Sequence, residues 1–193
     1  MKRRAASTRC RRSATTRRRS CSAERVRSAR GRRMTLPQVS VCYLLRERGG
    51  RTEVLLGRKL RGFGEGYVVG PGGKLEPGES TAEAAARELL EETGFRVETS
   101  ALEYRGRVTY LFPHRDAWSL ESNVFVSRRF GGEQVASDEL ALEWFDVDEV
   151  PFAEMWDDAR RWLPGVLAGG RASGTFVYGR DLATVVEAPT PVA

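Results

Sequence analysis

The sequence predicts an α+β domain in which a mixed β-sheet packs against helices. Residues 38–147 contain several short runs rich in β-branched and aromatic residues, separated by Gly, Pro and polar turn residues. Only two segments, 80–93 and 156–167, are predicted to be helical. Strands and helices do not alternate regularly, as they would in a series of βαβ units, and this favours a mixed sheet.

Local signals place the individual elements. Gly49 and Gly50 mark a turn between the first two strands, and Gly94 is the residue expected for a left-handed cap after the first helix. A turn over 149–155 precedes the second helix, and the final VVEAPTPVA is expected to fray. The expected strands are 38–46, 52–58, a short one near 67–69, 96–112, 122–129, 142–147 and 174–178.

Basic residues are concentrated at the start of the chain. Residues 1–33 contain thirteen Arg and one Lys against a single acid, Glu24, whereas residues 34–193 carry a net charge of −7. The first 33 residues also lack Leu, Ile and aromatic side chains, so they cannot bury enough apolar surface to fold. We therefore expect a disordered Arg/Ser-rich tail over 1–33, one folded domain over 34–188, and a frayed end over 189–193.

Three roles for the tail stay open: an upstream extension of a protein that starts at Met34, a targeting segment, or a segment that binds polyanions. Because the domain itself is acidic, a nucleic-acid partner is not expected except through the tail. No run of eighteen apolar residues predicts a membrane span. Three cysteines without metal or disulfide spacing indicate a reducing compartment, so we expect a cytoplasmic protein. We also expect a monomer.

An acidic cluster lies on the first predicted helix. Glu88, Glu91 and Glu92 fall in one arc, where like charges three or four residues apart oppose helix formation. They also lie toward the helix C-terminus, where the macrodipole disfavours negative charge. A bound cation would offset this cost, and clustered carboxylates suit a hard ion such as Mg²⁺, with Mn²⁺ as the alternative. Taken alone, the cluster is also typical of a solvated helix surface.

The loop before this helix makes the pattern specific. Gly73 is followed after five residues by Glu79, and after seven more by the run RELLEETGF over 87–95. This pattern resembles the signature of the Nudix hydrolase family, with every fixed position occupied. The resemblance implies a Nudix α/β/α sandwich and Mg²⁺-dependent cleavage of a nucleoside-diphosphate-type bond.

The resemblance also assigns roles within the motif. It implies that Glu88, Glu91 and Glu92 are metal ligands, together with the backbone carbonyl of Gly73. It implies that Glu79 and Arg87 are structural and tie the loop to the helix. The carboxylate that removes the proton from water varies across the family, so the expected catalytic candidates are Glu91, Glu92 and Glu139.

A wider similarity, over residues 38–187, is to the MutT-like branch of the family that hydrolyses oxidised purine nucleoside triphosphates. It rests on KLRGFG over 59–64, on Trp144-Phe145 and on the region from Pro151 to Trp162. The expected product pair is a monophosphate and pyrophosphate, from substrates such as 8-oxo-dGTP. The residues expected to bind the substrate are Lys59, Phe63, Tyr110, Phe112, Trp156 and Asp158.

Two positions depart from that branch. Val69 stands where an Asn is expected to read the purine, and Ala159 stands where a second Asp is expected. Changes of hydrogen-bonding groups in a base pocket alter discrimination strongly. The alternatives are therefore the same chemistry on an unmodified dNTP, a nucleotide sugar or a dinucleotide polyphosphate, a non-catalytic nucleotide sensor, or nucleic-acid binding through the tail.

Overall fold

The computed structural model describes residues 36–188 of the chain. The expected tail over 1–33 and the expected frayed end over 189–193 lie outside the described residues. The helices are α1 (Thr81–Thr93) and α2 (Ala159–Leu167), with short 3₁₀ turns at Thr99–Ala101, Asp116–Trp118 and Phe152–Glu154. The strands are β1 (Gln38–Arg48), β2 (Arg51–Lys59), β3 (Val68–Val69), β4 (Gly72–Lys74), β5 (Phe95–Arg96), β6 (Glu103–Leu111), β7 (Leu120–Ser127), β8 (Gly131–Gly132), β9 (Leu140–Asp146), β10 (Ala172–Tyr178) and β11 (Val185–Glu187).

The main sheet is mixed, as predicted. Its strand order is β11-β10-β6-β7-β1-β2-β3, with β4 paired to β1 and β9 paired to β2. The β1–β7 and β6–β10 pairs are parallel and the remaining pairs of this sheet are antiparallel. β1 is the central strand, since it pairs with β7 along one edge and with β4 and then β2 along the other.

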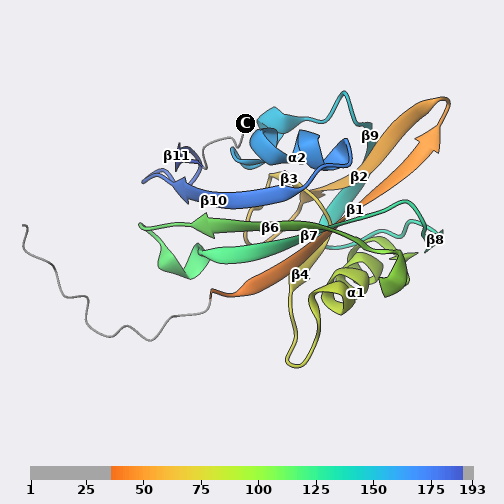
Figure 1. The fold of residues 1–193 in the computed structure, drawn as a ribbon, viewed down its shortest axis with the longest axis horizontal. Helices are drawn as coiled ribbons and strands as arrows, with labels where there is room; N and C mark the ends of the chain where they lie inside the picture. Colours follow the sequence, from red (N-terminus) through yellow and green to blue (C-terminus); the bar gives the residue numbers. More distant parts are fainter. Residues whose placement is uncertain (1–35, 189–193) are drawn as a thin grey trace, which may run out of the picture. The chain divides into compact units, whose positions relative to one another are not determined.

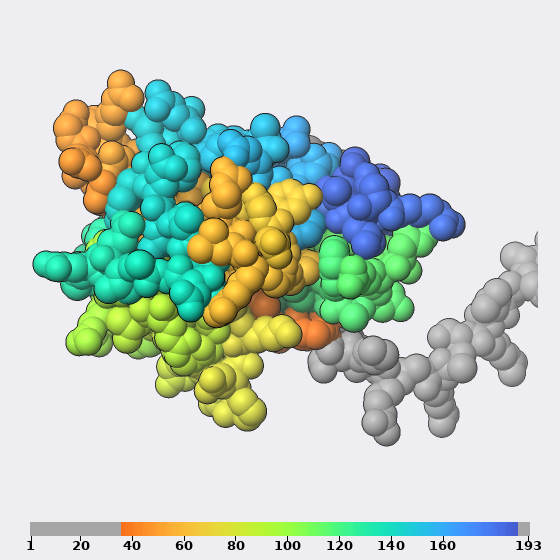
Figure 2. All heavy atoms as spheres, turned by 180° about the vertical axis from the view of Figure 1, so that it is seen from behind, coloured from red at the N-terminus to blue at the C-terminus, as the bar shows by residue number. Residues whose placement is uncertain are grey.

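Successive residues of β1 serve two separate cores, because side chains in a strand point alternately to its two faces. Tyr43 and Leu45 pack in the core beneath α2, whereas Cys42 and Leu44 pack in the core beneath α1. The two helices therefore cover opposite faces of the sheet (Figure 1). This is the predicted three-layer α/β/α arrangement, and the loop between β2 and β3 is exposed near the centre of the reverse face (Figure 2).

α1 confirms the first predicted helix, and its ends are well defined. The Ser80 hydroxyl accepts a hydrogen bond from the Glu83 amide and the Glu83 carboxylate accepts one from the Ser80 amide, which forms a capping box. Gly94 ends the helix with φ of 80° and donates its N–H to the Leu90 carbonyl. A left-handed residue is required at this position, which explains the glycine.

Three predicted elements differ from the structure. α2 begins at Ala159 rather than Trp156, because residues 156–158 form a turn that directs the Trp156 and Asp158 side chains toward a cavity. The final VVEAPTPVA was expected to fray, but its first three residues, 185–187, form β11. Val185 is buried and its amide donates to the Asp157 carboxylate. The long strand over 96–112 is broken by the 3₁₀ turn at 99–101.

β4 was not predicted, because Gly72-Gly73-Lys74 has no strand propensity of its own. Its backbone nevertheless pairs with Val39, Ser40 and Val41 of β1. Within residues 36–188, no helix is both long and apolar enough to cross a membrane.

Gly106 lies where the backbones of β6 and β10 come close together. It has φ of 119°, and a Cβ built there would lie 2.0 Å from the Ala172 carbonyl oxygen of β10. We predict that Gly106→Ala lowers the free energy of unfolding by at least about 2 kcal/mol, because backbone strain and a backbone collision add. Thermal denaturation should show a midpoint lower by roughly 4 °C or more.

The matched control is Gly131→Ala, where a Cβ would have no neighbour within 4 Å. Its midpoint should stay within about 1 °C of the wild-type value. Equal midpoints for the two variants would show that the β6–β10 pair is not tightly packed at Gly106.

Candidate active site

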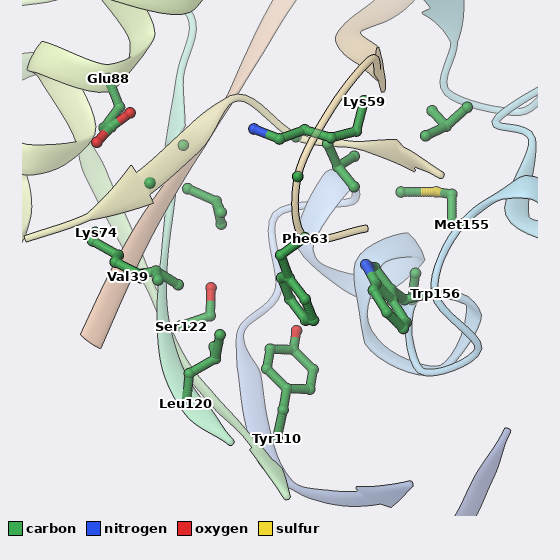
Figure 3. A pocket seen from close by; sticks show the side chains of 18 of the residues that line it. Val39, Lys59, Phe63, Lys74, Glu88, Tyr110, Leu120, Ser122, Met155 and Trp156 are labelled. Carbon is green, nitrogen blue, oxygen red and sulfur yellow. The ribbon is translucent and has the colours of Figure 1, made fainter. Parts of the chain in front are cut away.

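One cavity of about 760 Å³ lies between the sheet, the end of α1 and the start of α2. Glu88 and Lys59 face one end of it, and Phe63, Tyr110 and Trp156 point toward one another at the other end (Figure 3). The cavity therefore joins a charged region to an aromatic region. Such a shape fits a ligand that has an ionised part and a flat apolar part.

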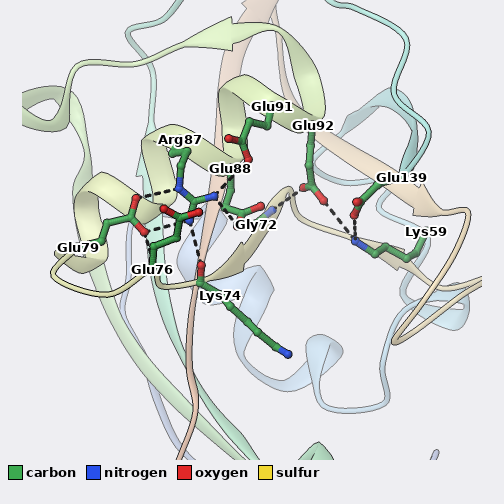
Figure 4. A network of polar contacts seen from close by, with 10 residues as sticks. All are labelled: Lys59, Gly72, Lys74, Glu76, Glu79, Arg87, Glu88, Glu91, Glu92 and Glu139. Atoms are coloured by element: carbon green, nitrogen blue, oxygen red, sulfur yellow. Dashed lines mark hydrogen bonds and ion pairs between the residues drawn. The ribbon is translucent and has the colours of Figure 1, made fainter.

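Glu92 is the most buried carboxylate at the charged end, with 5% of its surface exposed. Its Oε2 accepts a hydrogen bond from the Gly72 amide at 2.8 Å, and its Oε1 lies 3.3 Å from Lys59 Nζ. Burial raises the pKa of Glu92, and these two contacts oppose the rise. Glu92 thus connects α1 to β4 and to the end of β2 (Figure 4).

Lys59 bridges two acids that are distant in sequence. Its Nζ lies 3.1 Å from Glu139 Oε2 as well as 3.3 Å from Glu92. Burial lowers the pKa of Lys59, but the charge of Glu92 and the hydrogen bonds to both acids outweigh it and raise the pKa overall. The Lys59 hydrogen bond holds the pKa of Glu139 below its ordinary value, and Arg61 contributes at 3.3 Å.

Arg87 neutralises the other acids of the motif. Its guanidinium contacts both Glu79 carboxylate oxygens at 2.9 Å and Glu88 Oε1 at 2.9 Å, and it donates to the Lys74 carbonyl at 3.0 Å. Glu91, which is largely exposed, lies 3.2 Å from the same guanidinium. Such bidentate pairing fixes geometry as well as charge, so Arg87 ties the loop before α1 to the helix.

Gly73 permits the backbone of β4 to lie directly against the Glu88 carboxylate. A Cβ at this position would be 2.3 Å from Glu88 Oε1, so any side chain would displace the acid. Among residues 36–188, no three Asp, Glu, His or Cys side chains are grouped as a metal-binding cluster. Glu88 and Glu91 pair with Arg87, whereas Glu92 pairs with Lys59.

The aromatic end is built around Trp156. Its indole lies between the rings of Tyr67, at 4.3 Å between centroids, and Phe63, at 5.3 Å, and both pairs are stacked. Phe112 stacks on Tyr178 at 4.4 Å and meets Trp156 edge-on. Phe63 is 44% exposed despite these contacts, so its ring lies at the rim of the cavity.

Asp158 lies at the base of this aromatic region with 1% of its surface exposed. Its Oδ2 accepts a hydrogen bond from Trp162 Nε1 at 2.6 Å, and its Oδ1 accepts one from the Tyr178 hydroxyl. Burial raises the pKa of Asp158, while the donors Tyr178, Trp162 and Tyr110 oppose this rise. A buried carboxylate therefore faces the cavity with neutral donors around it.

The structure brings most of the sequence-predicted site residues to this cavity and places Glu79 and Arg87 beside it. Val69 and Ala159, the two departures, also line it. The predicted residues that line the cavity are Lys59, Phe63, Gly73, Glu88, Glu91, Glu92, Tyr110, Phe112, Glu139, Trp156 and Asp158.

Several lining residues were not predicted from the sequence. Val41 and Tyr43 of β1 and Tyr178 of β10 line the cavity, and Trp162 of α2 contacts it. Because side chains alternate along a strand, the sequence could have shown which residues of β1 and of β10 share a face. It could not have shown that this face lines the cavity. Their contribution depends on which strands become neighbours.

The comparisons with known proteins agree with the fold. The NUDIX domain model matches residues 34–166, and the chain belongs to the Nudix family of hydrolases. It is 41% identical over 130 residues to the oxidized purine nucleoside triphosphate hydrolase of Danio rerio, covering 67% of this chain and 81% of that protein. The Mus musculus protein of the same name is 37% identical over 125 residues, covering 65% and 78%.

Solved structures give the same assignment. The mutator MutT protein of Bacillus halodurans superposes with a TM-score of 0.68 and 30% identity, covering 80% of this chain and 97% of that one. The predicted Nudix α+β sandwich is therefore confirmed, and the protein is an enzyme of the Nudix hydrolase type.

The Lys59–Glu92 pair can be tested directly. We predict that Lys59→Met lowers the free energy of unfolding by about 1–3 kcal/mol, because it leaves a buried carboxylate without its cation. In a Glu92→Gln background the same change should cost less than about 1 kcal/mol, since the charge that needs the cation is gone. Urea denaturation of the four proteins of this cycle measures the coupling.

Lys74→Met is the matched control, because the Lys74 side chain is exposed and forms no ion pair within the described part of the chain. It should leave the free energy of unfolding within about 0.5 kcal/mol of wild type. A Lys59→Met cost that is the same in both backgrounds would contradict the coupling of Lys59 to Glu92.

Proposed function

We propose that this protein hydrolyses oxidised purine (deoxy)nucleoside triphosphates, such as 8-oxo-dGTP, to the monophosphate and pyrophosphate. One observation carries the proposal: a single cavity holds the Nudix carboxylates at one end and a buried Asp among aromatic rings at the other. A triphosphate together with a divalent cation suits the first end, and a purine suits the second. The Danio rerio and Mus musculus relatives, whose names specify this activity, support the assignment.

Nudix hydrolases generally need a divalent metal ion, and we propose Mg²⁺ here, with Mn²⁺ as the alternative. The donors fit a hard ion, because Glu88, Glu91, Glu92 and the Gly73 carbonyl offer only oxygen. The closeness of Glu88 to the Gly73 backbone supports their acting together. When bound, the ion neutralises charge on the phosphate oxygens and makes a coordinated water more acidic.

The residues of this chain supply the remaining chemistry. Lys59, between Glu92 and Glu139, offers a positive charge to the phosphates at the charged end. Glu91, Glu92 and Glu139 are the candidates that accept the proton of the attacking water. Burial raises the pKa of Glu92 and Lys59 lowers that of Glu139, so these directions favour Glu92 as the stronger base.

A second candidate is the same chemistry on another nucleotide: an unmodified dNTP, a nucleotide sugar or a dinucleotide polyphosphate. Val69 and Ala159 favour it, because both line the cavity where the similar enzymes are expected to place polar groups. A nucleotide panel assayed for Mg²⁺-dependent release of pyrophosphate or phosphate decides between the two. The proposal expects 8-oxo-dGTP to give the highest kcat/KM, and a nucleotide sugar as the best substrate would overturn it.

Glu92→Gln tests the carboxylate cluster. We predict that kcat falls at least about 100-fold while the fold is kept, because the change preserves shape but removes a charge from the cluster. Steady-state kinetics and circular dichroism on the same preparation measure both effects. Glu98→Gln, at an exposed position after α1, is the control and should keep wild-type kcat; comparable turnover in both variants would remove Glu92 from the proposed site.

Asp158→Asn tests base recognition. Losing one buried hydrogen bond to a purine should cost about 1–3 kcal/mol, so we predict that kcat/KM for the best purine triphosphate falls roughly 5- to 150-fold. Phosphate chemistry at the other end is untouched, so kcat/KM for a pyrimidine triphosphate should change less than about twofold. Equal losses on both substrates would place Asp158 outside base recognition.

The domain boundary is a separate proposal. Within the described part of the chain, the residues that line the cavity run from Val39 to Tyr178, all after Met34. We predict that a protein starting at Met34 keeps kcat/KM on a free nucleotide within about twofold of the full chain. A loss beyond roughly tenfold would mean that the first 33 residues contact the substrate or the site.

A further inference from the structure

The two oxygens of Asp158 already accept hydrogen bonds from the protein. Trp162, one helical turn after Asp158 in α2, donates to Oδ2 at 2.6 Å, and Tyr178 of β10 donates to Oδ1. These partners come from different layers of the fold, so they fix the carboxylate in position and orientation. Asp158 is buried yet lines the cavity, so the fixed group faces whatever occupies the aromatic end.

The partners of Asp158 are neutral, which sets it apart from its neighbour. Asp157 forms an ion pair with Arg160 at 2.9 Å and lies 3.6 Å from Arg161. Within residues 36–188, Asp158 forms no ion pair. Neutral donors do not cancel the charge of an ionised Asp158, so this carboxylate can accept hydrogen bonds from a ligand as well as from the protein.

We infer that Tyr178, together with Trp162, holds Asp158 as a fixed hydrogen-bond acceptor and thereby selects a purine of the guanine type over one of the adenine type. The inference rests on the proposed function, in that the aromatic end takes the base. Guanine and its 8-oxo form present two adjacent N–H donors, N1–H and the 2-amino group, which match a carboxylate. Adenine presents an acceptor at N1. A carboxylate, which only accepts hydrogen bonds, repels that acceptor, whereas a protonated acid could donate to it.

The surrounding tyrosines keep this acceptor role stable. Three tyrosines face Asp158: Tyr43 of β1, Tyr110 of β6 and Tyr178 of β10. The charge of the neighbouring Asp157 also raises the pKa of Tyr178. Burial and the charge of Asp158 raise the pKa of each tyrosine, so all three hydroxyls stay protonated at neutral pH. Hydroxyls that remain donors resist protonation of Asp158, although its burial favours the neutral acid.

The test measures binding of nucleoside monophosphates, which requires no turnover. Guanosine and adenosine monophosphates are titrated into the full chain with Mg²⁺ by calorimetry. The wild-type protein should bind the guanine nucleotide at least about tenfold more tightly. Affinity for it should fall at acidic pH, as Asp158 becomes protonated.

Tyr178→Phe keeps the ring that stacks on Phe112 and removes only the hydroxyl. Affinity for the guanine nucleotide should fall roughly 5- to 20-fold, whereas affinity for the adenine nucleotide should stay the same or rise. The acidic loss of guanine binding should move to higher pH, because Asp158 loses a donor that stabilises its charged form. A merely structural role would not move this pH profile.

Tyr104→Phe is the matched control, because Tyr104 is an exposed residue of β6 outside the cavity. It should reproduce the wild-type preference and pH profile. If Tyr178→Phe proves poorly folded by thermal denaturation, Trp162→Phe removes the other donor and carries the same expectation. An unchanged guanine-to-adenine ratio in a folded variant, or equal wild-type affinities for the two nucleotides, would overturn the inference.

These outcomes separate the inference from the proposed function. A guanine preference that depends on Tyr178, in a protein that does not hydrolyse 8-oxo-dGTP, would uphold the inference and reject the proposed substrate. Hydrolysis of 8-oxo-dGTP without a Tyr178-dependent preference would do the reverse.

Discussion

Glu92 is a carboxylate placed almost entirely out of water, and three segments converge on it. α1 carries it, the Gly72 amide at the start of β4 donates to one oxygen, and Lys59 at the end of β2 approaches the other. Removing a charge from water is costly unless it is paired and hydrogen-bonded, so the segments must stay together. The same contact places α1 against the sheet and brings its other carboxylates to the cavity.

Glycine makes this convergence sterically possible. Where β4 passes Glu88, a side chain at Gly73 would overlap the carboxylate, and where it passes β1, one at Gly72 would overlap the Ser40 carbonyl. A side chain at Gly70 would likewise overlap the Tyr43 ring, because a Cβ built there would lie 2.7 Å from a ring carbon. The loop before α1 is therefore rich in glycine because backbone, acid and aromatic ring must share a narrow space.

The two ends of the cavity handle negative charge differently. At the Nudix motif, the acids form ion pairs with Arg87 and Lys59. A bound cation could take the place of a basic side chain beside an acid, and a phosphate could take the place of an acid beside a basic side chain. At the base end, Asp158 is held by neutral hydroxyl and indole donors. The ion-paired acids at the first end thus suit the binding of a cation and phosphates. The carboxylate at the second end suits recognition of hydrogen-bond donors on a base.

What the sequence determined by itself is what lies within short stretches of chain. The capping box at Ser80 and Glu83, the cap at Gly94 and the spacing from Gly73 to Glu92 are local, so the first helix, the family and the place of the motif carboxylates on that helix could be predicted. The order of strands and helices along the chain, which lacks regular βαβ alternation, likewise predicted a mixed sheet packed against helices. These features depend on neighbours a few residues apart, whose geometry the helix and strand periods dictate.

The tertiary structure decided the features that depend on distant partners. β4 forms because its backbone pairs with β1, although glycine has little strand propensity. β11 forms because it pairs with β10, although a run of three residues is too short to predict a strand by itself. Lys59 meets Glu139 across eighty positions, and Asp158 meets Tyr178 across twenty. No local pattern encodes such pairs, because hydrogen bonds between elements form only after strand order and layer packing have brought the donors and acceptors together.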